Sequence, residues 1–171
     1  MVDGTELTVT LLGGSPEDRA VGCGADGLGG EAVWVAGVST GLACGQMTSL
    51  RVIGSAFTDQ ISIIGIDWFD GTIAFPALTS LSVDAGAGND VVRARVAAPV
   101  SVVELGQGDD VLQSGDIGGS MPLDVRGGDG HDLYLFYVSL GRVVVTDDAL
   151  DRKSTRLNSS HLKLSRMPSS A

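Results

Sequence analysis

Three short segments repeat one pattern, G-x-G-x-D followed by apolar residues, and this repeat constrains the fold more than any other feature of the chain. The segments are Ala85–Asp90, Leu105–Asp110 and Gly127–Asp132. Their aspartates recur at intervals of about 20 residues, the length of one coil of a β-solenoid. Glycines allow the backbone to direct several carbonyl oxygens at one point, and each Asp adds a hard anionic oxygen. The pattern therefore predicts turns that bind calcium.

The repeat resembles the RTX, or haemolysin-type, calcium-binding repeats, whose consensus is G-G-x-G-x-D-x-U-x with a large apolar residue at U. Gly127–Leu135 matches every fixed position, with Tyr134 at U, whereas the other two copies have Ala85 and Leu105 in place of the first glycine. The resemblance implies an all-β fold, a right-handed parallel β-roll or β-helix solenoid with about 20 residues per coil. In that family, stacked loops share Ca²⁺ through loop carbonyls and the Asp carboxylate.

The resemblance assigns the metal ligands to the inner glycines and the aspartate of each copy. These residues are Gly86, Gly88, Asp90, Gly106, Gly108, Asp110, Gly128, Gly130 and Asp132. One edge of the solenoid is expected to bind metal, because the motif occurs once per coil. Two weaker copies lie upstream, Gly54–Ile63 with Asp59 and Gly13–Val21 with Asp18. Whether Asp18 or Asp59 binds metal stays open.

The chain is expected to have three parts. Residues 1–80 form a degenerate N-terminal part of the solenoid, and residues 81–150 contain the calcium-binding repeats. Residues 151–171 hold both lysines and none of the 25 glycines of the chain. Their sequence matches, codon for codon, a translated sequencing adapter, so we interpret them as an artefactual, disordered tail and residues 1–150 as a fragment of a longer protein.

Charge and composition restrict the partners. Of the 21 acidic and 11 basic residues, one and five lie in residues 151–171, which leaves residues 1–150 with a net charge of −14. This charge argues against nucleic acid as a partner and favours cations. No apolar run is long enough to span a membrane, and residues 1–6 have none of the features of a signal peptide. An extracellular location is therefore implied by the family resemblance alone.

The two cysteines, Cys23 and Cys44, are separated by one predicted coil, which would place them within disulfide reach. A disulfide and a pair of buried thiols are both compatible with this spacing. We find no catalytic site. His131 occupies a variable loop position, and adjacent aspartates such as Asp109 and Asp110 point to opposite faces of a strand. We expect the chain not to be an enzyme.

These observations lead to one main hypothesis and two alternatives. The main hypothesis is a calcium-binding β-roll module of a secreted or cell-surface bacterial protein, which folds and is stabilised on binding extracellular calcium. In the first alternative, the chain is the non-catalytic export and folding module of a secreted enzyme, such as a protease, a lipase or a polysaccharide-modifying enzyme. In the second, it is a metal-independent adhesive stalk. The role and partner of the parent protein are not predicted.

Overall fold

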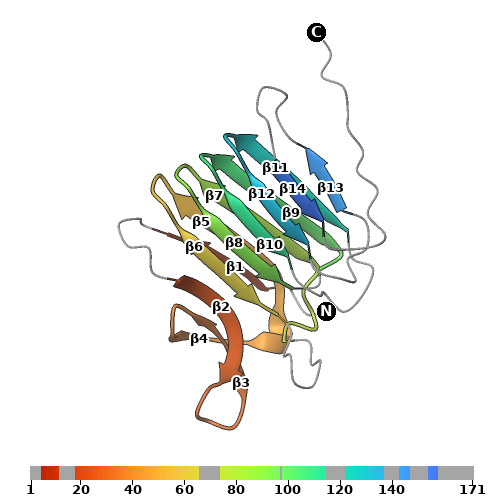
Figure 1. The fold of residues 1–171 in the computed structure, drawn as a ribbon. Helices are drawn as coiled ribbons and strands as arrows, with labels where there is room; N and C mark the ends of the chain where they lie inside the picture. The colour runs from red at the N-terminus through yellow and green to blue at the C-terminus, as the bar shows by residue number, and fades with distance from the viewer. Residues whose placement is uncertain are drawn as a thin grey trace.

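The computed structural model describes residues 5–11, 18–65, 74–96, 98–114, 122–136, 143–146 and 154–157, which form two β-sheets packed face to face (Figure 1). Sheet A has six strands in the order β1-β5-β7-β9-β11-β13, and every neighbouring pair is parallel. Its strands are β1 (Thr5–Thr10), β5 (Met47–Ser55), β7 (Ser80–Gly86), β9 (Val100–Gln107), β11 (Leu123–Asp129) and β13 (Val143–Thr146).

Sheet B has eight strands in the order β14-β12-β10-β8-β6-β2-β3-β4. Pairing is parallel from β14 to β2, but β3 lies antiparallel to both β2 and β4. Its strands are β2 (Asp18–Ala25), β3 (Glu31–Val35), β4 (Val38–Ala43), β6 (Gln60–Ile64), β8 (Val91–Arg95), β10 (Val111–Ser114), β12 (Leu133–Phe136) and β14 (Ser154–Leu157). A short 3₁₀ helix, η1 (Cys44–Gln46), connects β4 to β5.

Alternating side chains along the strands build the core between the sheets. In β7, Leu81, Val83 and Ala85 are buried while the residues between them are more exposed. The same alternation runs through β9 and β11, because successive residues of a strand point to opposite faces. Small branched side chains fill this core, and the stacked rings of Tyr134 and Phe136 on β12 enlarge it locally. The periodicity visible in the sequence is thus the periodicity of the buried face.

The predicted fold class is wrong. The structure is a sandwich-like arrangement of two sheets, one parallel and one mixed, and not a single right-handed β-roll solenoid. The difference is clearest in residues 18–43, where two tight turns reverse the chain and make β2, β3 and β4 antiparallel. Gly27, Gly29 and Gly37 have positive φ angles in these turns, a conformation that glycine adopts without steric cost. The glycines of this segment therefore make hairpins and not coils.

The two cysteines form a disulfide, with 6.0 Å between their Cα atoms. The sequence left open a disulfide and a pair of buried thiols, and the structure has the disulfide. The spacing of one solenoid coil is not what brings the two cysteines together. Cys23 lies on β2 and Cys44 begins η1, so the segment between them, with a sequence separation of 21, contains the β2–β3 and β3–β4 turns and not one solenoid coil. The bond fixes the antiparallel end of sheet B to the segment that enters β5 of sheet A.

Some parts of the sequence analysis fall on residues that the structure does not describe. They are the side chain of Asp18, residues 66–73 and 115–121, and most of the C-terminal segment 151–171. Within that segment Ser154–Leu157 forms β14, which pairs with β12. The adapter origin of residues 151–171 stays a prediction.

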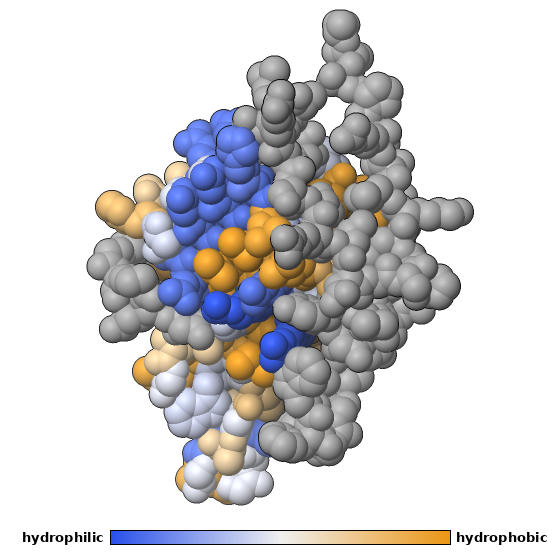
Figure 2. Space-filling model, in the orientation of Figure 1, coloured by the Kyte–Doolittle hydropathy of each residue, from blue (hydrophilic) through white to orange (hydrophobic). Residues whose placement is uncertain are grey.

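Charge is unevenly distributed over the molecule. Residues 32–43, which contain most of β3 and all of β4, have no charged side chain. In Figure 2 hydrophilic residues cover the upper part of the visible face, and paler residues predominate over the β2–β4 hairpins below. On the outer face of sheet A, Arg126 of β11 forms an ion pair with Glu104 of β9, the neighbouring strand. The uncharged segment 32–43 thus differs from the parallel strands, where the acidic residues of the stacked turns lie.

Removal of the disulfide is expected to destabilise the fold. The double variant Cys23→Ser/Cys44→Ser should lose about 3 kcal/mol of unfolding free energy, because the unfolded chain regains the entropy of an open loop of this length. Urea unfolding of the variant and of the unsubstituted protein, with and without reductant, measures this loss. Reductant should lower the stability of the unsubstituted protein alone. Equal stability of the variant and the unsubstituted protein in the absence of reductant would contradict the prediction.

Candidate functional site

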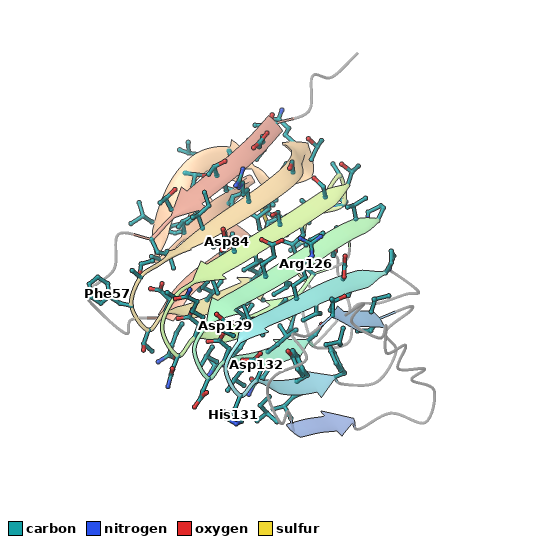
Figure 3. All side chains as sticks on the ribbon, turned by 90° about the horizontal axis from the view of Figure 1, so that it is seen from above. Phe57, Asp84, Arg126, Asp129, His131 and Asp132 are labelled. Carbon is teal, nitrogen blue, oxygen red and sulfur yellow. A yellow bond between two sulfur atoms is a disulfide. The ribbon has the colours of Figure 1, made fainter. Side chains whose placement is uncertain are left out.

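The three glycine-rich turns occupy equivalent positions in the two-sheet fold. Each turn leaves the end of a strand of sheet A and enters a strand of sheet B: β7 to β8, β9 to β10 and β11 to β12. The turns stack at one edge, where Figure 3 shows Asp129, His131 and Asp132 close together. A fourth turn, from Ser55 of β5 to Gln60 of β6, continues the stack, and Phe57 protrudes from it. The sequence repeats are thus brought together in space.

The turn glycines are required by the backbone conformation. All six inner glycines have positive φ angles, between 89° and 131°. They are also too closely stacked for a side chain, since a Cβ added to Gly106 would lie 1.9 Å from the carbonyl oxygen of Gly86. The same distance separates a Cβ on Gly128 from the carbonyl oxygen of Gly106. The pattern G-x-G therefore selects a turn that can be stacked on its own copies.

Four aspartates form a buried column behind these turns. Asp59, Asp90, Asp110 and Asp132 are each at most 3% exposed. The backbone N–H of each of the first three donates to Oδ1 of the next aspartate in the column, over 2.7 Å, 2.7 Å and 3.1 Å. The carbonyl oxygens of the same three aspartates accept from Val91, Val111 and Leu133, the first residues of β8, β10 and β12. Each carboxylate thus holds the preceding turn in register with the turn to which the carboxylate belongs.

The hydrogen bonding of Oδ2, the second oxygen of each carboxylate, differs between the middle of the described column and its two ends. At one end, Asp59 Oδ2 accepts a hydrogen bond from the backbone N–H of Ser55 over 2.7 Å. At the other end, Asp132 Oδ2 accepts one from the Tyr134 hydroxyl over 3.2 Å. Oδ2 of Asp90 and Oδ2 of Asp110 are buried and have no hydrogen-bond partner among the described residues. The middle of the column therefore contains two buried carboxyl oxygens that are left without a hydrogen bond by the described residues.

Burial and proximity oppose ionisation of these two groups. The pKa of Asp90 is raised to about 6, chiefly by loss of hydration; the hydrogen bond from the Asp59 backbone opposes this rise, and the charge of Asp59 adds to it. Loss of hydration likewise raises the pKa of Asp110 to about 7, and the charges of Asp90, Asp132 and Asp109 contribute to this rise. A proton or a cation would relieve the repulsion along the column.

A second, exposed row of side chains runs beside the buried column. The backbone N–H of Asp109 donates to Oδ1 of Asn89 over 3.1 Å, and that of His131 donates to Oδ1 of Asp109 over 2.8 Å. The imidazole Nδ1 of His131 lies 3.5 Å from the same Asp109 oxygen. Sequence reasoning treated His131 as a solvated side chain and missed this row. The signal was present, since all three residues directly precede an aspartate of the column.

The structure brings together every glycine and aspartate that the sequence assigned to the metal site, and it adds Asp59 to the column. Among the described residues, no group of three or more His, Cys, Asp or Glu side chains is placed to hold a metal ion. A cation at this edge would therefore need backbone carbonyl oxygens in addition to the carboxylates. In the part of the chain that is described, no helix is long and apolar enough to cross a membrane.

Comparison with known proteins gives no relative with which the site can be compared. No family model, no curated protein and no solved structure matches this chain.

A side chain at a stacked glycine is expected to disrupt the turns. Gly106→Ala should lower the unfolding free energy by at least about 2 kcal/mol, because its φ of 101° is unfavourable for alanine and its Cβ would overlap the backbone of Gly86. Gly45→Ala is the matched control, since Gly45 has open space around its Cβ position. Urea unfolding of both variants measures the difference. Similar stabilities for the two variants would contradict the stacked geometry.

The two raised pKa values predict how stability depends on pH in the absence of metal. Asp90 and Asp110 keep their protons to about pH 6 and 7 in the folded state, but titrate near 3.8 when unfolded. The folded state thus binds more protons between about pH 4 and 7, so the unfolding free energy falls as pH rises through this window.

Each group contributes a slope of at most about 1.4 kcal/mol per pH unit. Urea unfolding in chelator between pH 4 and 8 measures this slope, and Asp110→Asn should reduce it. A stability that rises throughout the window would contradict the prediction.

Proposed function

We propose that the chain is a calcium-binding module whose stacked turns are stabilised by Ca²⁺ at the aspartate column. The observation that carries the proposal is the pair of buried, unpartnered oxygens, Asp90 Oδ2 and Asp110 Oδ2. Buried charged groups are normally paired, because the loss of hydration is costly. In a column of carboxylates a bound cation would supply the missing partner.

The chemistry of the available ligands favours calcium over other metals. Ca²⁺ takes six to eight oxygen ligands in flexible geometry and accepts both carboxylates and backbone carbonyls. The column offers carboxylate oxygens, and the stacked glycine turns that precede each aspartate contain backbone carbonyls. Zinc and copper prefer His and Cys, but both cysteines form the disulfide. The donor set therefore fits a hard cation.

A location outside the cell follows from the same proposal. Weak calcium sites fill at the millimolar concentrations found outside cells, and disulfides persist in oxidising compartments. The bond between Cys23 and Cys44 supports this assignment. We propose an extracellular, non-catalytic module that gains stability when it meets external calcium.

A metal-independent stack is the second candidate, and one observation favours it. The hydrogen bonds from Asp59, Asp90 and Asp110 N–H groups to the next carboxylate connect the turns without an ion. In that case, protons on the middle aspartates would replace the cation. The two candidates differ in their response to calcium at pH 8, where both carboxyls are ionised.

Calcium binding and its effect on stability test the proposal. Thermal unfolding of the full chain at pH 8 should shift upward with millimolar calcium but not with equal magnesium, and titration calorimetry should detect binding. Asp110→Asn should raise the stability in chelator, because it removes a buried charge and leaves an amide oxygen to accept the Asp90 N–H. The same variant should bind calcium at least about tenfold more weakly, equivalent to about 1.4 kcal/mol.

Asp124→Asn provides the control for the loss of one charge. Asp124 lies on β11, outside the aspartate column, and its side chain is partly exposed. This variant should keep the calcium response of the unsubstituted protein. If the unfolding temperature of the unsubstituted protein is the same in calcium and in chelator, the metal-independent stack is correct and the calcium proposal is not.

A further inference from the structure

The residue two positions after each column aspartate faces the core at an equivalent place in every turn. Pairing of β6, β8, β10 and β12 puts these residues in one row: Ile61, Val92, Leu112 and Tyr134. All four are fully buried. Each member lies two residues after its aspartate in the chain, and the Tyr134 side chain contacts the carboxylate of its own aspartate.

Only the last member of this row has a polar atom. The Tyr134 hydroxyl donates to Asp132 Oδ2 over 3.2 Å, and Oδ1 of the same carboxylate accepts the Asp110 N–H. Val92 and Leu112 have only hydrocarbon at the equivalent position. The aspartates two residues before them, Asp90 and Asp110, have the two Oδ2 atoms without a partner. Ile61 is also hydrocarbon, but Asp59 Oδ2 accepts its hydrogen bond from the Ser55 backbone. Among the three glycine-rich turns, the Oδ2 atom thus has a partner only where the row contributes a hydroxyl.

We infer that the Tyr134 hydroxyl takes the place of a cation at the last turn and restricts calcium to the turns of Asp90 and Asp110. This inference rests on the proposed calcium-binding function and adds a residue that determines which turns bind metal. Both Asp132 oxygens are hydrogen-bonded within the protein, so the last turn is stable without an ion. Asp132, which the motif assigns to the metal site, is then a structural residue at the end of the column.

Tyr134→Phe tests this role directly. The variant keeps the ring, and with it the stacking on Phe136 at a centroid distance of 6.5 Å, but removes the hydroxyl. Asp132 Oδ2 is then buried without a partner, like the two middle oxygens. Titration calorimetry at pH 8 should detect one more calcium ion per chain than in the unsubstituted protein. The variant should unfold at a lower temperature in chelator and recover most of this loss in calcium.

Two further variants separate this inference from a general loss of packing. Ser114→Ala removes another buried hydroxyl of sheet B, one that donates to Ala94 O, and should leave the number of bound ions unchanged. Asp132→Asn should retain the calcium affinity of the unsubstituted protein within about twofold, less than 0.5 kcal/mol. These two measurements do not require that Tyr134→Phe folds.

The outcomes distinguish the inference from the function on which it rests. If Tyr134→Phe binds the same number of ions and loses equal stability with and without calcium, the hydroxyl is only structural and the inference is wrong. If Asp132→Asn weakens calcium binding as strongly as Asp110→Asn, Asp132 is a ligand and the inference also fails. The proposed function survives both results. An unsubstituted protein that binds no calcium would overturn both.

Discussion

The hydrogen bond from one aspartate's backbone to the next aspartate's carboxylate is the interaction on which the rest of the structure depends. Parallel strands cannot be joined by a short hairpin, so each strand must be placed by the turns before and after it. Here the Asp110 carboxylate accepts a hydrogen bond from the N–H of Asp90, in the turn before it. Val111, the first residue of the strand after Asp110, donates to the carbonyl oxygen of the same Asp90. The register of sheet B is therefore set at the turns, where the side chains are polar, as well as in the apolar core.

This way of setting register places like charges close together in a buried column. Asp90 and Asp110 have opposing requirements, since they must accept hydrogen bonds as carboxylates but are separated from water. Their raised pKa values express this conflict. At neutral pH the column is stable only where something compensates the charge. The Ser55 N–H donates to Asp59 Oδ2 and the Tyr134 hydroxyl donates to Asp132 Oδ2, whereas Asp90 Oδ2 and Asp110 Oδ2 have no hydrogen-bond partner among the described residues.

The repeats allowed the stacking of the glycine-rich turns to be expected from the sequence, but not the fold as a whole or the hydrogen bonds of the buried column. In the structure the turns that contain Gly106, Gly108 and Asp110 do stack on their copies, whereas their role as metal ligands stays a prediction. Asp59 could be suspected from its offset after Gly54 even though the inner glycines are missing. The antiparallel hairpins could not be recognised, because Gly27, Gly29 and Gly37 are equally compatible with a solenoid turn and a reversal. Their role is decided by which strands pair, and strand pairing is a long-range property.

Which column oxygens are hydrogen-bonded and which are not could not be predicted from the sequence, for a similar reason. The repeat treats Val92, Leu112 and Tyr134 as equivalent apolar residues, and by burial they are equivalent. Among their different side chains only that of Tyr134 contains a hydrogen-bond donor, the hydroxyl that reaches Asp132 Oδ2. A consensus records which residue types recur, but it does not record which buried oxygens are left without a hydrogen-bond partner. In this fold turns with the same motif thus differ in their hydrogen bonding, because the Asp132 turn is followed by a tyrosine whose hydroxyl donates to the carboxylate.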